Sequence, residues 1–152
     1  MVPFPGPPPP PSGQAVEVRR TIAAKRERVF AAWTRAEEMK RWSGPGPMTV
    51  PICEVDLRVG GRYRLQMRAP DGATHTAFGS YREIDPPKRL VYTWSWEENP
   101  AVRDSVVTVE FIDRGNSTEV VLRHEGLPTE KERTDHENGW TGALDRLVTL
   151  LA

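Results

Sequence analysis

The feature that most constrains the fold is a run of strand-like segments from residue 49 to residue 126, with no helical pattern between them. The segments are TVPICEVDLRV, RYRLQMRA, THTAFGSYREID, RLVYTWSWEE, DSVVTVEFID and TEVVLRHEG. Most are separated by turn signals: Gly60-Gly61, DG at 71 and 72, PPK before RLVYTWSWEE, and RGNS before TEVVLRHEG. Strands joined by short turns pair antiparallel, so this region is predicted to form an antiparallel meander.

One of these segments concentrates large rings on one side. In RLVYTWSWEE the residues Leu90, Tyr92, Trp94 and Trp96 lie two apart. Side chains two apart in a strand point to the same face of a sheet. Two interpretations remain open: the rings fill a solid core between sheet and helix, or they wall a cavity that holds another molecule.

A strand and two short helices are predicted before the meander. VEVRRTI (16–22) alternates as a half-buried strand does, and KRERVFAAWT then places Val29, Phe30 and Trp33 at helical spacing. Thr34 and Glu37 have the spacing of a capping box for a second helix that ends near Trp42. The segment SGPGP (43–47) breaks the chain directly afterwards.

A long helix is predicted at the end of the chain. Thr129 and Glu132 form a second capping box after Pro128. An apolar stripe at helical spacing follows, made of Trp140, Leu144, Leu147, Val148 and Leu151. The first half of the helix, EKERTDHEN, is polar all round, which predicts that it lies over an opening or runs free at the edge of the sheet.

The chain divides into a proline-rich tail and one domain. Residues 1–14 (MVPFPGPPPPPSGQ) are mostly proline and glycine, which predicts a disordered, polyproline II-like tail; docking on a partner's aromatic groove is the alternative. The packed pattern covers residues 15–152. A chain of 152 residues with 38% apolar content is long enough for one core and short for two.

Composition and motifs exclude several classes of function. Lys plus Arg equals Asp plus Glu at 21 each, so no basic surface for nucleic acid is expected. A single cysteine rules out an intrachain disulfide, and we find neither a secretory signal nor an apolar run of about 18 residues, which predicts a cytoplasmic protein without a membrane span. The histidines His75, His124 and His136 have no metal-ligand spacing, and no phosphate loop or GxSxG motif occurs. No metal and no cofactor are predicted.

Five stretches in this order resemble the START-like superfamily, which has the birch-pollen-allergen (SRPBCC, helix-grip) fold. They are RVFAAWT (28–34), DLRVGGRYRLQM (56–67), GSYREIDPPKRLVYTW (79–94), TEVVLRHEGLP (118–128) and GWTGALDRLVTLL (139–151). Within that superfamily the chain is most similar to proteins like the C-terminal domain of the activator of Hsp90 ATPase. Each stretch alone is a weak signal, whereas five in family order are specific. The proline-rich tail lies outside the resemblance.

The resemblance implies an α+β helix-grip fold. A curved antiparallel sheet wraps around a long C-terminal helix, with two short helices after the first strand and a pocket between sheet and helix. In different members of the superfamily this pocket holds lipids, sterols, polyketides or hormones, and a few members use it for catalysis. The fold alone does not choose among these functions.

The inward phase of the strands and the helix stripe together predict a set of ligand-binding residues. Large rings with polar tips suit the wall of a pocket. The predicted set is Tyr63, Leu65, Met67, Tyr92, Trp94, Trp96, Val109, Phe111, Leu122, His124, Trp140 and Leu144. No catalytic residue is assigned.

His124 is the polar residue of most interest, because it continues the inward phase of Val120 and Leu122. Its imidazole could orient a ligand or move a proton, or it could be a structural group bonded to a backbone or tyrosine oxygen. Cys53 is expected to be a buried and inert thiol, since nothing in the sequence supplies a base for it. Arg62, Arg64 and Arg68 alternate on the outer face, where they are either solvated and balanced by acids or available to an acidic partner.

The leading functional hypothesis is binding of a small apolar or aromatic molecule without catalysis. An enzyme of cyclase or hydrolase type acting in the same cavity is the second hypothesis. A co-chaperone-like module with a chaperone partner is the third, and the absence of a second domain of a full co-chaperone counts against it. The protein is expected to be a monomer or a homodimer.

Overall fold

The computed structural model describes residues 15–152, so the predicted tail at 1–14 and its boundary lie outside the described residues. The element order is one strand, two helices, six strands and a final helix. The elements are β1 (Val16–Ile22), α1 (Arg26–Thr34), α2 (Ala36–Trp42), β2 (Thr49–Val55), β3 (Arg62–Arg68), β4 (Thr74–Asp85), β5 (Arg89–Trp96), β6 (Ser105–Asp113), β7 (Thr118–Glu125) and α3 (Glu130–Leu150). This order confirms the predicted α+β helix-grip fold.

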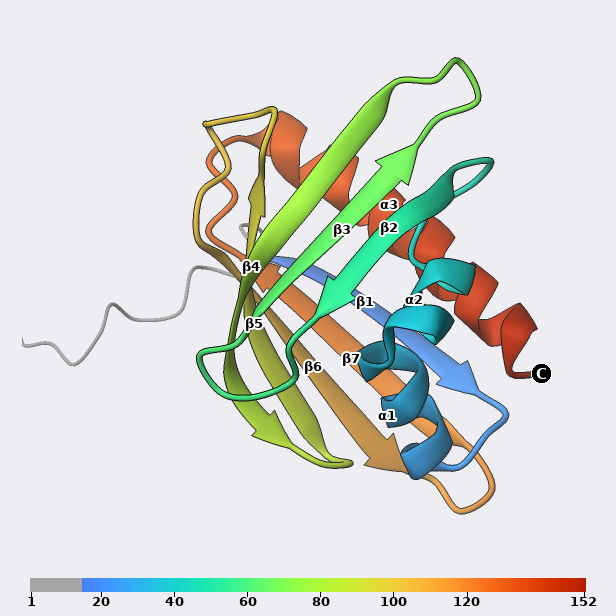
Figure 1. The fold of residues 1–152 in the computed structure, drawn as a ribbon. Coiled ribbons are helices and arrows are strands. Elements are labelled where there is room, and N and C mark those ends of the chain that lie inside the picture. Colours follow the sequence, from blue (N-terminus) through green and yellow to red (C-terminus); the bar gives the residue numbers. More distant parts are fainter. Residues whose placement is uncertain (1–14) are drawn as a thin grey trace, which may run out of the picture.

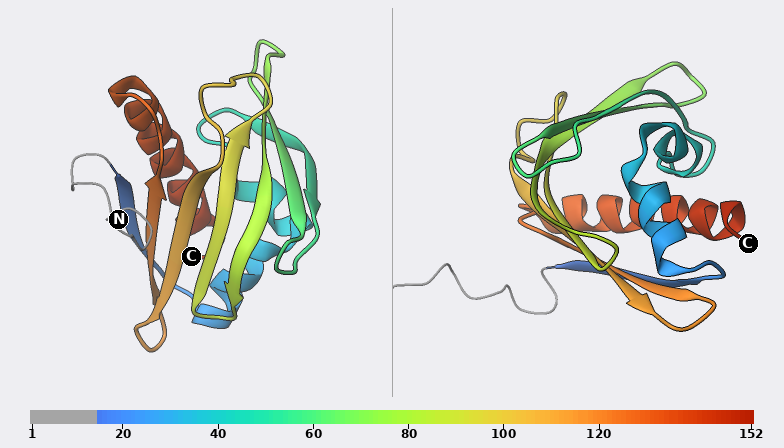
Figure 2. Two further views of the ribbon diagram at one scale, coloured as in Figure 1. Left: turned by 90° about the vertical axis from the view of Figure 1, so that its left-hand side faces the viewer. Right: turned by 60° about the horizontal axis from the view of Figure 1, so that its bottom comes forward.

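The seven strands form one antiparallel sheet in the order β1-β7-β6-β5-β4-β3-β2. The sheet curls around the helices, and all three helices lie on its inner side (Figures 1 and 2). Two features support the curl. The pairing of β4 with β5 shifts register between Tyr81 and Glu83, and a Cβ at Gly79 would lie 2.1 Å from the carbonyl oxygen of Thr93, so only glycine permits this approach.

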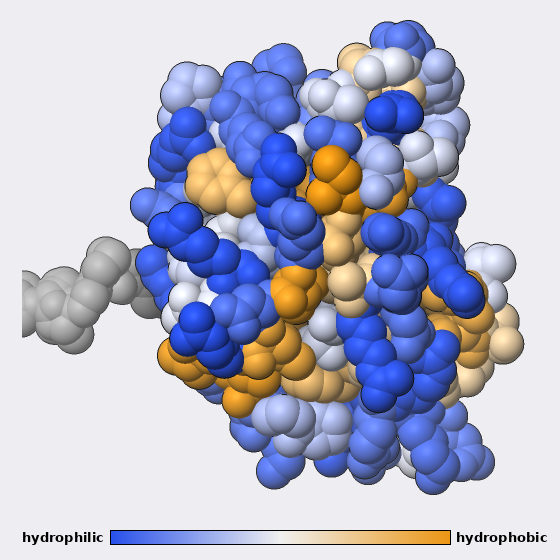
Figure 3. All heavy atoms as spheres, in the orientation of Figure 1, coloured by the Kyte–Doolittle hydropathy of each residue, from blue (hydrophilic) through white to orange (hydrophobic). Residues whose placement is uncertain are grey.

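Alternation along the strands places the apolar side chains on the inner face. In β3 the inward positions Tyr63, Leu65 and Met67 are buried, and the outward positions between them are more exposed. The outer face is largely hydrophilic, and Arg64 forms a two-pronged ion pair with Glu97 across the sheet. On the face drawn in Figure 3, hydrophobic residues show as separate patches between hydrophilic ones.

The two short helices occur where predicted, but the first capping box is wrong. Thr34 is the last residue of α1, and its hydroxyl donates to the carbonyl of Phe30 one turn back. The residue that precedes α2 is Arg35, which makes no side-chain cap. Spacing alone therefore misassigned Thr34, because a threonine inside a helix bonds within that helix.

The strand predicted over 49–59 is shorter than expected. β2 ends at Val55, and residues 56–61 form a loop in which Leu57 and Val59 are 42% and 63% exposed. The loop closes around Gly60, which has a φ of 85°, and Gly61, where a Cβ would lie 2.1 Å from the Asp56 carbonyl oxygen. The connection between β2 and β3 is thus wider than a two-residue hairpin turn.

The C-terminal helix begins as predicted. The Thr129 side chain accepts a hydrogen bond from the backbone N–H of Glu132, at 3.1 Å. Trp140, Leu144 and Leu147 are buried in the main apolar core, and α3 packs on β1. Among residues 15–152, no helix combines the length and the apolar character needed to cross a bilayer.

Candidate functional site

A cavity of about 520 Å³ lies between the curled sheet and the helices. Its wall on the sheet side comes from β3, β4 and β5, and its opposite wall comes from α1, α2 and α3. The loops after α2 and β5 complete the lining with Ser43, Pro45, Met48, Glu98 and Asn99. The four residues of β5 that lie two apart and share one face all border this cavity: Leu90, Tyr92, Trp94 and Trp96.

The predicted site residues divide into two groups. Those that line the cavity are Tyr63, Leu65, Met67, Tyr92, Trp94, Trp96 and Trp140. Those that lie in the buried core beside it are Val109, Phe111, Leu122, His124 and Leu144. The second group is separated from the cavity because helices pack directly over that part of the sheet: Phe111, for example, meets Phe30 and Trp33 of α1 at ring distances of 5.3 and 5.6 Å.

The aromatic wall is continuous from β3 through β5 to α3. The Trp94 ring lies 5.3 Å from Trp96 and 5.0 Å from Trp140, and the Tyr63 ring lies 5.4 Å from Tyr92. The Trp94–Trp96 and Tyr63–Tyr92 pairs have interplanar angles of 89° and 83°, the edge-to-face geometry that aromatic pairs prefer, and the Trp94–Trp140 pair is tilted at 52°. The wall is therefore stiff, since each ring is held by another.

The tyrosines of the lining are uncharged hydrogen-bonding groups. Tyr63 donates to the Thr93 carbonyl at 2.6 Å, and Tyr92 accepts from Trp33 Nε1 at 3.3 Å. Burial raises the pKa of Tyr63, Tyr81 and Tyr92 well above that of a free phenol. These hydroxyls stay protonated at any physiological pH.

His124 is fully buried, as its phase in β7 predicted, and both of its ring nitrogens are occupied. Trp140 Nε1 donates to Nδ1 at 3.0 Å, so Nδ1 carries no proton. Nε2 therefore carries the proton and donates to Ser105 Oγ at 2.8 Å, and Ser105 donates in turn to the Trp94 carbonyl. His124 is thus a neutral structural group that holds Trp140 and the start of β6 in place.

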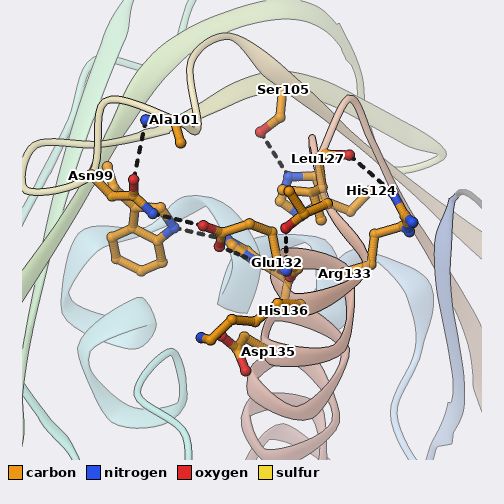
Figure 4. A network of polar contacts seen from close by, with 12 residues as sticks. Asn99, Ala101, Ser105, His124, Leu127, Glu132, Arg133, Asp135 and His136 are labelled. Atoms are coloured by element: carbon orange, nitrogen blue, oxygen red, sulfur yellow. Dashed lines mark hydrogen bonds and ion pairs between the residues drawn. The ribbon is translucent and has the colours of Figure 1, made fainter.

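His136 of α3 also accepts a hydrogen bond from a tryptophan indole. Trp96 Nε1 donates to its Nε2 at 2.8 Å, and its Nδ1 faces the Glu132 carbonyl one turn back at 2.7 Å. The two histidine rings are perpendicular, 5.2 Å apart. Figure 4 shows His136 and Glu132 on the same side of α3, close to Asn99 of the loop after β5. Two indole–imidazole pairs therefore fix the aromatic wall to the helix.

The buried His124 makes folding sensitive to acid. Burial, with a smaller contribution from His136, lowers the pKa of His124 from 6.5 to about 3. The unfolded chain takes up a proton near pH 6.5 and the folded chain does not, so this contribution to stability is complete above pH 6.5 and is lost as the pH falls toward 3. We expect a loss of about 2 to 3 kcal/mol between pH 6.5 and 4.5 from this residue.

Urea unfolding of the wild type and of His124→Asn at pH 7.0, 5.5 and 4.5 measures this contribution. The asparagine amide oxygen can still accept from Trp140 but does not titrate. The free energy of unfolding should fall less steeply with acid in the variant. Equal pH slopes in the two proteins would contradict the assignment.

Cys53 is buried, as expected, with its thiol 3.9 Å from Met39 Sδ. Burial raises the pKa of the thiol to about 11, so it stays protonated and unreactive at neutral pH. Within residues 15–152, no three His, Cys, Asp or Glu side chains are placed to share a metal ion.

Two buried polar atoms of the lining residues have no hydrogen-bond partner among the described residues. They are Nε1 of Trp94, which is 4% exposed, and Oγ of Ser43, which is 7% exposed. Buried polar atoms are satisfied in the great majority of native structures. These two atoms are the unsatisfied polar groups of the lining residues.

Several lining residues were missed from the sequence. Gly139 lies within the continuous helix α3 and lines the cavity, and a Cβ built there meets no heavy atom within 4 Å. An isolated glycine inside a helix pattern was the available signal. The first half of α3 contributes Lys131, Glu132 and Asp135 to the lining, as expected of a polar segment over an opening.

Arg146 holds the loop between α2 and β2 against the cavity. Its Nη1 donates to the carbonyls of Gly44 and Met48, and more weakly to that of Gly46 at 3.4 Å. We expect Arg146→Met to speed amide exchange of Met48, whose N–H donates to the Pro45 carbonyl, by about tenfold or more, because the loop loses the hydrogen bonds that hold its carbonyls. Hydrogen-exchange mass spectrometry measures this effect.

Arg133→Met is the matched control, because Arg133 donates to the Leu127 carbonyl at the other end of α3. It should leave exchange in the loop unchanged. Equal loop exchange in wild type and Arg146→Met would show that the guanidinium does not hold the loop.

Comparisons with known proteins give a consistent result. A family model described as Activator of Hsp90 ATPase homolog 1-like protein matches residues 23–152. The human activator of 90 kDa heat shock protein ATPase homolog 1 is 25% identical over 126 residues, which are 82% of this chain and 33% of the human protein. The mouse protein of the same name is 22% identical over the same length. The chain thus spans about a third of the length of the curated relatives it matches.

Solved structures extend the likeness to nearly the whole chain. A crystal structure of a protein from Chromobacterium violaceum superposes with a TM-score of 0.84 at 25% identity, covering 91% of this chain and 96% of the other. The AHSA1 protein from Silicibacter pomeroyi superposes with a TM-score of 0.81, also at 25% identity, covering 90% and 96%. Both likenesses include the sheet and all three helices that surround the cavity.

Proposed function

The chain belongs to the family of activator of Hsp90 ATPase homolog 1-like proteins, and from this premise we propose that it binds a small apolar or aromatic molecule in the cavity between the sheet and α3. The observation that carries the proposal is the cavity itself. Its volume of about 520 Å³ falls within the range of small-molecule sites.

The chemistry of the lining supports an apolar body with a few polar atoms. Tryptophan, tyrosine, leucine and methionine side chains supply most of the wall. Two of the lining residues, Trp94 and Ser43, each carry a buried polar group without a partner among the described residues. A site that is apolar with a small number of placed polar groups is typical of small-molecule binding.

Binding is favoured over catalysis by the state of the titratable groups. Both nitrogens of His124 and of His136 are engaged by protein groups, so neither imidazole is free to take a proton from a bound molecule. The tyrosines and Cys53 stay protonated. These histidine, tyrosine and cysteine side chains therefore provide no activated base or nucleophile for the enzyme hypothesis.

The experiment that tests the proposal is native mass spectrometry of protein purified from cells, followed by titration with the neutral fluorescent probe N-phenyl-1-naphthylamine. We expect a retained small molecule or, after its removal, saturable probe binding with one site per chain. A protein that retains nothing and does not bind the probe would overturn the proposal. Conversion of the probe or of the retained molecule on incubation would favour the enzyme hypothesis.

A co-chaperone role is the second candidate, favoured by the match to the human Hsp90 ATPase activator homolog over 82% of this chain. The test is the ATPase rate of Hsp90 with and without this protein. An increase that survives blocking of the cavity would support an interaction through the outer surface. No change in the rate would leave ligand binding as the function to pursue.

A further inference from the structure

We infer that the molecule held in the cavity carries a positively charged group, such as an amine, which lies beside Glu132 at the polar end of the cavity. This inference rests on the proposed function and specifies the chemical class of the ligand. It is carried by the charge of the lining, by the surroundings of Glu132 and by the aromatic wall next to it.

The charged residues of the lining are predominantly acidic. Three carboxylates border the cavity, those of Glu98, Glu132 and Asp135, against a single ammonium, that of Lys131. No arginine is among the lining residues. Lys131 is already paired, because its Nζ lies 2.7 Å from Asp135 Oδ2. An anionic ligand would meet repulsion at this end of the cavity, and a cationic ligand would meet attraction.

Glu132 is the carboxylate least shielded by water, because its side chain is only 19% exposed. It accepts a hydrogen bond from Asn99 Nδ2 at 2.9 Å. The nearest group that could carry a positive charge is His136, whose Nδ1 lies 4.0 Å from Glu132 Oε1. His136 is neutral, since Trp96 donates to its Nε2. Within the described residues, the Glu132 carboxylate therefore has one hydrogen-bond donor, Asn99, and no ammonium or guanidinium at ion-pair distance. A partly buried carboxylate favours a cation as partner.

The aromatic wall adjoins this carboxylate. The hydrogen bond from Trp96 Nε1 to His136 Nε2 places the Trp96 indole beside His136, one turn of α3 from Glu132. Trp94 lies 5.3 Å from Trp96 and continues the wall inward. Indole faces attract cations, most strongly where water is excluded. The Trp94 N–H is also buried without a hydrogen-bond partner among the described residues.

The test compares three probes that share one ring system and differ in charge: 1-pyrenemethylamine, 1-pyrenemethanol and 1-pyrenecarboxylate. Fluorescence titration at pH 7 and low salt should give the order amine, alcohol, carboxylate, with the amine bound about tenfold or more tightly than the carboxylate. Added salt should reduce this preference. The alcohol measures the cavity without the charge.

Glu132→Gln removes the charge and keeps an acceptor for Asn99. It should weaken amine binding by about fivefold or more and change alcohol binding by less than about twofold. Glu137→Gln is the matched control, because Glu137 lies on the same helix, is exposed and does not line the cavity. It should change neither affinity. Circular dichroism verifies that both variants fold.

The outcomes separate this inference from the proposed function. If none of the three probes binds, the cavity does not take small molecules of this kind and the proposed function fails. If all three bind with similar affinity, or if the carboxylate binds most tightly, the cavity binds ligands but the inferred preference for a cation is wrong. The same conclusion follows if Glu132→Gln and Glu137→Gln weaken amine binding equally.

Discussion

Trp94→Ala is expected to weaken probe binding by about tenfold or more while lowering the free energy of unfolding by only about 2 to 3 kcal/mol. The cost is below that of emptying a packed core site for two reasons. The removed ring borders a space that already exists, so less new void is created. Its indole N–H is buried without a partner, so removing the ring also removes an unsatisfied group.

Phe111→Ala is the matched control. Phe111 is buried against Phe30 and Trp33 and does not line the cavity. Phe111→Ala should lower the free energy of unfolding by roughly 3 to 5 kcal/mol, the cost of a large-to-small change in a packed core. The affinity of the folded protein for the probe should be nearly unchanged. Urea unfolding and titration with N-phenyl-1-naphthylamine measure both quantities. If Trp94→Ala costs more than about 4 kcal/mol and the wild type binds no probe, the rings fill a solid core.

Gly139→Phe is expected to abolish most probe binding, with a loss of about twentyfold or more, without destabilising the protein. Gly139 lies in α3 and lines the cavity, and a Cβ there meets no heavy atom within 4 Å. The new side chain can therefore enter the cavity instead of clashing. Replacing a glycine inside a helix also removes a penalty of about 1 kcal/mol relative to alanine, so stability should be unchanged or higher.

Gly139→Ala separates the two effects. It should raise the free energy of unfolding by about 0.5 to 1 kcal/mol and leave probe binding within about twofold of the wild type. If Gly139→Phe binds the probe as the wild type does, the bound molecule does not occupy this cavity. A variant that loses binding while gaining stability would be hard to explain by a general structural defect.

The strands and the final helix were predictable because their signals are local. Alternation with a period of two decides which face of a strand is buried, and this held for Tyr63, Leu65 and Met67. The Thr129 cap was also predictable, since it depends on residues three positions apart. The same rule failed at Thr34, where the sequence has the spacing but the preceding helix already contains the threonine. The end of β2 was missed because a glycine pair allows more than one loop length.

The candidate site was only partly predictable from the sequence. The inward phase correctly placed the side chains of β3, β5 and β7 in the interior, yet it could not tell a cavity wall from a packed core. Leu122 and Trp94 share that phase, but only Trp94 borders the cavity. The role of His124 was also undecided, because its tautomer depends on Trp140, which reaches it from another element.

The sequence by itself determined the order of the elements, the buried face of each strand and the family, because these follow from short-range periodicity and from motifs in order. Only the tertiary structure decided where the cavity lies, since its volume depends on the distance between a bent sheet and the helices across it. That distance is set by the register shift in β4, the close approach at Gly79, the loop held by Arg146 and the missing side chain of Gly139. These features involve contacts between residues far apart in the chain, so the volume of the cavity cannot be predicted from any local sequence pattern.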